Sequence, residues 1–203
     1  MTKDGSDRAD ISGGLAARIL FAWRDLRGSV RALAERNPSE GYLLFLAMLS
    51  GLFWFLSAMA VMYATPPTIV VEEGAIYSRI GAEFAGALIF RTLGLYVVAL
   101  AGWGIARACG GTGSARDSRT ALFWASLVAG PLVLAMTLGQ VALAPPVSDE
   151  WVSMLVGQIG MIAFIWATAE NFSELHGFRQ SWPALAVLGL LTLALLGTAK
   201  LLQ

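Results

Sequence analysis

The chain has 203 residues, of which 57% are apolar and only 14% are charged, and its mean hydropathy is +0.66. Its 14 Lys and Arg residues balance its 14 Asp and Glu residues, so the formal net charge is zero. Because soluble domains carry about 25% charged residues, this composition excludes an ordinary soluble domain and indicates a membrane protein.

Residues 13–36 are predicted to form an amphipathic helix. Six apolar residues recur at spacings of four and three and fall within an arc of about 80°: Leu15, Ile19, Trp23, Leu26, Val30 and Leu33. Such a helix can lie in the cytoplasmic interface, where acyl chains and anionic headgroups hold it. Its stripe can equally pack on the ends of the spans or on a partner, and the sequence leaves both open. The candidate membrane-surface residues are Arg18, Trp23, Arg24, Arg27 and Arg31.

Five long apolar segments follow, each near the ~20 residues that cross a bilayer. They are residues 41–64, 84–106, 120–144, 151–169 and 183–199. Helical spans satisfy all their backbone groups within the lipid. We therefore expect an all-α polytopic membrane protein, with a cytoplasmic segment at 1–40 that carries the amphipathic helix and a five-helix transmembrane domain at 41–203.

Small residues recur within these spans. The third span has one at every fourth position, and the first and fourth spans each have a pair: Ala121, Ala125 and Ala129; Ala47 and Gly51; Gly157 and Gly160. Such positions let helices approach closely. We expect contacts within the chain rather than with another subunit.

The basic residues are distributed unevenly between the two predicted sides of the membrane. Seven precede the first span and four lie in or beside the second and fourth connections: Lys3, Arg8, Arg18, Arg24, Arg27, Arg31, Arg36, Arg107, Arg116, Arg119 and Arg179. The other side carries only Arg79 and Lys200. This asymmetry places the N-terminus and the connections 107–119 and 170–182 in the cytoplasm, and 65–82, 145–150 and Gln203 outside.

Three polar side chains lie within the predicted spans: Arg91, Gln140 and Gln158. Arg91 follows Glu83 by eight residues, about 12 Å along a helix, which places it in the outer half of the second span. An arginine at membrane depth is costly and therefore a functional candidate. A hydrogen bond to Gln158 would reduce this cost, and snorkelling to the outer headgroups is the alternative. We favour a structural role for Arg91.

The sequence offers few groups for catalysis. Cys109 is the only cysteine and His176 the only histidine, so one chain can form neither a disulfide nor a Cys/His metal site. Glu170 and Glu174 could together bind a cation or carry protons, although a solvated helix end is the favoured interpretation. We predict no enzyme activity, no cofactor and no metal.

The glycine-rich residues 110–118 lack the Lys-Ser/Thr ending and the preceding strand of a phosphate-binding loop. We expect a flexible turn there, in which Asp117 or Ser118 caps the third span. The basic N-terminal helix does not indicate nucleic-acid binding, because it also has an apolar face and adjoins a span.

Three short motifs keep a fixed order relative to the spans. Asn37-Pro38-Ser39-Glu40 precedes the first span, residues 106–111 (ARACGG) follow the second, and residues 175–178 (LHGF) precede the fifth. With five crossings, the chain resembles the YIP family, the Ypt/Rab-interacting membrane proteins, in its bacterial branch, over roughly residues 30–200. The resemblance implies a five-helix membrane domain without established catalytic residues. Eukaryotic relatives are associated with Rab-type GTPases, but no residue here matches a motif that would carry that role.

Two functions remain as hypotheses. The first is a non-enzymatic inner-membrane protein that organises membrane or binds other membrane proteins, or further copies of itself, with anionic headgroups as its lipid partner. The second is a small transporter or channel subunit with a polar path near Arg91, Gln140 and Gln158.

Overall fold

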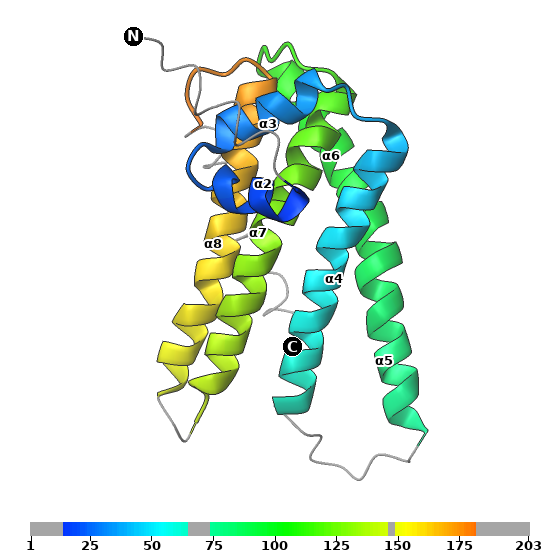
Figure 1. Cartoon of the computed structure of the whole chain (residues 1–203), viewed down its shortest axis with the longest axis vertical. Helices are drawn as coiled ribbons and strands as arrows, with labels where there is room; N and C mark the ends of the chain where they lie inside the picture. Colours follow the sequence, from blue (N-terminus) through cyan, green and yellow to red (C-terminus); the bar gives the residue numbers. More distant parts are fainter. Residues whose placement is uncertain (1–13, 65–73, 146–148, 182–203) are drawn as a thin grey trace.

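The computed structural model describes residues 14–64, 74–145 and 149–181, and its regular elements in these ranges are all helical. Two short helices come first, and longer helices follow. They are α2 (Leu15–Ala22), α3 (Leu26–Glu35), α4 (Glu40–Ala64), α5 (Ala75–Ala85), the π-helical turn η1 (Gly86–Phe90), α6 (Arg91–Ala108), α7 (Ala115–Ala142) and α8 (Glu150–Leu175). α5, η1 and α6 form one uninterrupted helix (Figure 1).

Four of these helices are long and apolar enough to cross a membrane. They are α4, the 34-residue helix from α5 to α6, α7, and α8 from Trp151. These helices confirm four of the predicted segments as membrane-competent, while the predicted fifth span at 183–199 lies outside the described residues. The second helix is longer than predicted, because it begins at Ala75 rather than at residue 84. At ~1.5 Å per residue it exceeds the ~30 Å hydrocarbon core, so it must tilt or extend beyond it.

α7 is the central helix of the bundle. It packs most extensively on α8 and then on α4, and it also contacts α2, α3 and α6. The predicted ladder of small residues, Ala121, Ala125 and Ala129, is at most 1% exposed. These residues therefore serve packing within the chain, as expected.

The other small-residue pairs also mark close contacts between helices. A Cβ atom added to Gly51 would lie 2.5 Å from the carbonyl oxygen of Ala87 in η1. One added to Gly160 would lie 3.0 Å from the Cα atom of Val133 in α7. Only glycine lets the helix backbones approach this closely.

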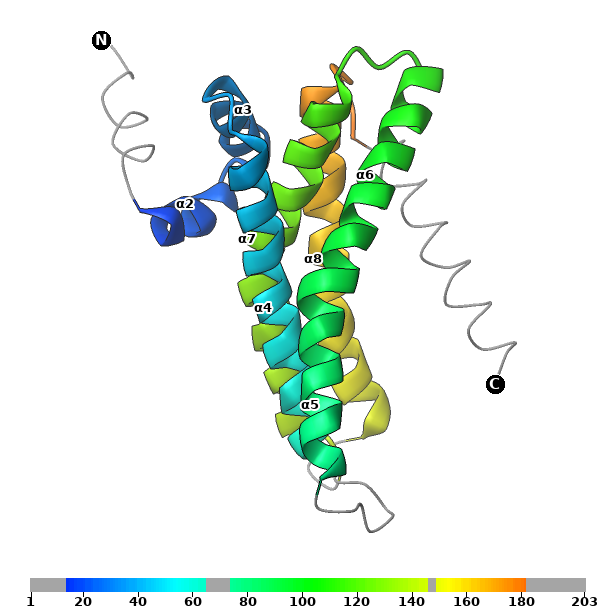
Figure 2. The same ribbon diagram turned by 90° about the vertical axis from the view of Figure 1, so that its right-hand side faces the viewer.

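The N-terminal segment differs from the prediction of one helix over 13–36, because the chain turns between α2 and α3. Asp25 is the N-cap of α3, and its side chain accepts a hydrogen bond of 2.8 Å from the amide of Gly28. Asp competes well for this position because its carboxylate satisfies an otherwise unpaired amide. As a result, α2 lies across the direction of the bundle while α3 runs to its end (Figure 2).

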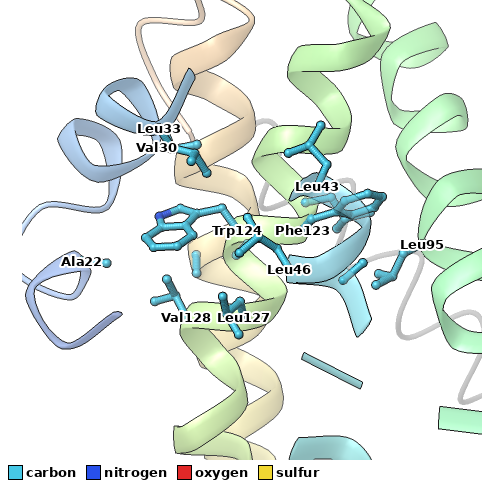
Figure 3. Close-up of a cluster of buried hydrophobic side chains, with 14 of the residues drawn as sticks. Ala22, Val30, Leu33, Leu43, Leu46, Leu95, Phe123, Trp124, Leu127 and Val128 are labelled. Atoms are coloured by element: carbon cyan, nitrogen blue, oxygen red, sulfur yellow. The ribbon is translucent and has the colours of Figure 1, made fainter. Parts of the chain in front are cut away.

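The apolar stripe of these two helices packs on the bundle. Ile19, Leu26, Val30 and Leu33 are at most 8% exposed and belong to the same core as the middle of α7. Figure 3 shows Trp124 of α7 directed toward α2 and α3, and Phe123 directed toward α4 and α6. Of the two alternatives left open by the sequence, the structure shows the stripe packed on the helices of the chain.

Candidate functional site

Arg91 is the one described arginine that is placed in the interior of the bundle, at the junction of η1 and α6. Its Nη1 donates a hydrogen bond of 2.9 Å to Oγ of Ser50 in α4, and its Nη2 donates one of 2.6 Å to Oγ of Ser126 in α7. Its guanidinium carbon lies 4.9 Å from the ring centroid of Trp54. One cationic side chain thus connects three membrane-competent helices.

The depth of this guanidinium corrects the prediction from the sequence. Ser50 lies close to the middle of α4 (Glu40–Ala64), and Ser126 lies close to the middle of α7 (Ala115–Ala142). Both hydrogen bonds therefore hold Arg91 near the middle of the bundle, not in the outer half. The expected partner Gln158 is instead exposed on α8.

Gln140 and Gln158 differ in their exposure. Gln140 is half-buried and its amide packs against Gly157 of α8, where there is no space for a Cβ atom. Arg91 thus bonds serines of α4 and α7, whereas Gln140 packs on α8.

Two serine hydroxyls, rather than a negatively charged group, accept the hydrogen bonds of the buried Arg91 side chain. Within the described ranges, no carboxylate forms an ion pair with Arg91. The hydroxyl of Ser50 also donates a hydrogen bond of 2.7 Å to the carbonyl of Ala47, which leaves its oxygen lone pairs to accept from Arg91. A buried cation without these acceptors would lose its water without compensation.

A second group of polar contacts, which we call the charged clamp, joins α3 to α8. It consists of Arg27, Arg31, Glu170 and Glu174. Nε of Arg27 lies 2.6 Å from Oε2 of Glu170, and Nη2 of Arg31 lies 2.5 Å from Oε1 of Glu174. The hydroxyl of Ser181 donates a further hydrogen bond of 2.6 Å to Glu170.

The charged clamp changes the interpretation of both glutamates and of two predicted surface arginines. Glu170 and Glu174 are ion-paired carboxylates rather than a solvated helix end, and the described residues contain no His/Cys/Asp/Glu group that could hold a metal. Arg27 and Arg31 direct their charge to α8. The sequence signal was the equal spacing of four residues in both pairs, which brings both charges to one helix face.

The other predicted membrane-surface residues contact aromatic rings. The guanidinium carbon of Arg18 lies 5.2 Å from the ring centroid of Trp124, and that of Arg24 lies 4.8 Å from that of Phe21. The Trp23 ring is 6.1 Å from the Trp166 ring of α8. Arg24 is exposed, while Arg18 and Trp23 are half-buried.

His176 connects the glycine-rich loop to the end of α8. It is 1% exposed, and its Nε2 lies 2.8 Å from Oγ of Ser118. The ring stacks on Phe172 and Phe178, with centroids 4.9 and 6.4 Å away. Burial lowers the pKa of His176, and the nearby carboxylate of Asp117 opposes this shift. We infer that the ring is neutral near pH 7.

The loop caps α7, and of the two expected residues only Asp117 takes part in the cap. Ser114 is the N-cap of α7, and it forms a capping box with Asp117. Asp117 therefore supports the cap from the third helical position, and Ser118 bonds His176 instead. A Cβ atom at Gly113 would lie 2.7 Å from the His176 ring, so the loop needs glycine there for close packing.

These features describe an all-helical, multi-pass membrane protein with a polar connection inside the bundle and an ion-paired N-terminal segment. The Yip1 domain model matches residues 23–201, which is most of the chain. The chain therefore belongs to the YIP family. No curated protein matches it, and no solved structure does.

Arg91 and its two serines should respond differently to substitution. Ser50→Ala combined with Ser126→Ala leaves a buried cation unpaired, so we expect a loss of about 2–4 kcal/mol of stability. Arg91→Leu removes the charge together with its solvation cost and should change stability by about 1 kcal/mol or less. Unfolding of the purified chain in micelles measures both, with Ser78→Ala, an exposed serine, as control. A larger loss for Arg91→Leu than for the double variant would contradict this account.

His176 should make stability depend on pH. Its pKa is lowered in the folded chain, so below the unfolded value of 6.5 the unfolded chain binds the proton first. We expect stability to be constant above pH 6.5 and to fall as the pH decreases from 6.5 through the lowered pKa. Thermal unfolding from pH 8 to pH 5 measures this decrease. It should be smaller in His176→Gln, and an equal decrease in this variant would assign the effect to other groups.

Proposed function

We propose that this YIP family member is a non-enzymatic protein of the bacterial inner membrane, in which α2 and α3 form a platform at the cytoplasmic face that binds other membrane proteins. The observation that supports this most is the charged clamp, because it fixes α3 on α8 through residues from both helices. A segment that served only as a mobile membrane anchor would not need such ion pairs.

The platform combines a packed inner side with a charged outer side. Val30 and Leu33 of α3 are buried, whereas Glu35 on this helix and Arg36 at its end are exposed. On α2, Leu20 is 71% exposed. A surface with both charges and a protruding leucine suits contact with a partner at the membrane boundary.

The orientation follows from the basic residues. Among the described residues, all basic side chains except those of Arg79 and Arg91 lie in α2 or α3 or at the end of the bundle near these two helices. The positive-inside rule places this end in the cytoplasm. Reporter fusions at residues 40 and 113 should report a cytoplasmic location, and fusions at 75, 147 and 203 an external one. A cytoplasmic report at 75 would reverse the assignment.

The platform can be tested through the charged clamp. Arg27→Glu places like charges opposite Glu170, so α3 should lose its fixed orientation on α8 while its apolar face stays packed. We expect affinity purification from native membranes to recover partner proteins with the unaltered chain and at least about fivefold less with this variant, since a reoriented α3 no longer presents the same surface.

The matched control restores the ion pair in reverse. Arg27→Glu combined with Glu170→Arg should recover the partners, while Arg24→Glu changes the same charge outside the clamp. Equal partner recovery from all variants, at equal amounts of membrane-inserted protein, would rule out the platform.

A second function is favoured by Arg91, which lies midway in the bundle beside a π-helical turn, a feature often found at functional sites. A transporter would use this cation to attract an anion. Loss of anion flux into reconstituted vesicles in a folded Arg91→Leu protein would support transport over the platform.

A further inference from the structure

We propose that an open hollow beside α2 binds the phosphate group of one anionic membrane phospholipid, with an acyl chain along α4. The hollow has a volume of about 320 Å³ and lies between α2, the end of α3 and the beginning of α4. Its lining residues are Arg18, Leu33, Arg36, Asn37, Pro38, Ser39 and Tyr42. Two arginines from different helices, a tyrosine and an apolar floor thus face one space.

The two arginines supply the charge that a phosphate requires. Arg18 of α2 is half-buried, and its guanidinium is held 5.2 Å from the Trp124 ring centroid, which limits its conformational freedom. Arg36 enters from the C-terminal end of α3 and is exposed. Guanidinium groups present several N–H donors in one plane and therefore bind phosphate oxygens in pairs.

The wall of the hollow is held in place by contacts from α7. Nη1 of Arg116 donates a hydrogen bond of 2.6 Å to Oδ1 of Asn37, and its Nη2 donates one to the carbonyl of Pro38. Asn37 itself adopts a left-handed backbone conformation with φ of 50°. This turn connects α3 to α4, so it sets the backbone positions from which Arg36 and Tyr42 reach the hollow.

The carboxylate at the beginning of α4 is paired. Glu40, the first residue of α4, lies 2.6 Å from Nη2 of Arg119. Its repulsion of a phosphate is thereby reduced.

An apolar face of α4 begins at the hollow. Tyr42 lines the hollow, and its ring is 6.2 Å from that of Phe45. Leu52 and Leu56 continue on the same side, within about 80° of arc at ~100° per residue. Phe45, Leu52 and Leu56 are 49%, 40% and 42% exposed. A cationic hollow that leads into an apolar helix face matches a phospholipid, whose phosphate and acyl chains are joined, better than a soluble phosphate.

This site differs from general attraction between a basic surface and anionic lipid. Arg27 and Arg31 belong to the charged clamp, and neither of them lines the hollow. The inference rests on the proposed function only in placing this end of the bundle at the headgroups. It does not depend on a protein partner, and binding in detergent can be observed whether or not the platform exists.

The test uses native mass spectrometry of the full chain in neutral detergent, titrated with palmitoyl-oleoyl phosphatidylglycerol. We expect saturation at one tightly bound lipid. Arg18→Gln and Arg36→Gln should each weaken its affinity about fivefold, because a basic residue at a lipid surface contributes about a fivefold factor. Arg24→Gln makes the same charge change on an exposed arginine outside the hollow and should alter affinity less than about twofold.

Two further titrations distinguish the ligand's source. Phosphatidylcholine with the same acyl chains should bind more weakly, and glycerol 3-phosphate should not compete at equal concentration. Competition by glycerol 3-phosphate would instead assign the hollow to a soluble phosphate and overturn the lipid proposal. An equal effect of Arg24→Gln and Arg36→Gln would show unspecific attraction. If Arg18→Gln fails to fold, unchanged lipid affinity in folded Arg36→Gln is sufficient to reject the site.

Discussion

The burial of one long stretch of α7 on all sides is the constraint on which the rest of the described structure depends. Its residues from Thr120 to Gly130 are buried without interruption, and this helix contacts α2, α3, α4, α6 and α8. Neighbouring helices approach where its side chains are small, as at Ala121 and Ala125. Where its side chains are large, Trp124 and Phe123 fill the wider spaces toward the N-terminal helices and toward α6. Alternation of size along one helix therefore determines which neighbour lies near and which lies far.

Arginines connect neighbouring helices, and each is compensated according to its surroundings. In the interior, Arg91 bonds two hydroxyls and so avoids the desolvation of a second ion. At the end of the bundle, Arg27 and Arg31 bond carboxylates that are only 16–19% exposed. Surface ion pairs contribute little singly, about 0–1 kcal/mol, but a connected group of them restricts the orientation of a short helix. α3 is such a helix, because ten residues are marginal without tertiary contacts.

The sequence predicted the features that depend on composition and periodicity. Four of the five predicted spans are helices long and apolar enough to cross a membrane, and the packing role of Ala121, Ala125 and Ala129 and membership of the YIP family also agree with the prediction. It did not predict the partners of Arg91, because serines in an apolar helix resemble packing residues until their helices are placed side by side. The turn at Asp25 was also missed: the apolar stripe continues across it with helical spacing, so periodicity concealed the cap.

The π-helical turn η1 has a consequence for the evolution of this helix. A π-helical turn accommodates one residue more than the α-helix around it. Deleting any single residue from Gly86–Phe90 would let the helix run regularly, but it would rotate everything before the turn by about 100° relative to Arg91. Either Ala87 would leave its close contact with Gly51, or Arg91 would point away from its serines. The extra residue thus lets one continuous helix place Ala87 against Gly51 and also turn Arg91 toward its serines, two contacts that a regular α-helix would direct to different sides. The length of this segment is therefore under stricter constraint than its individual side chains.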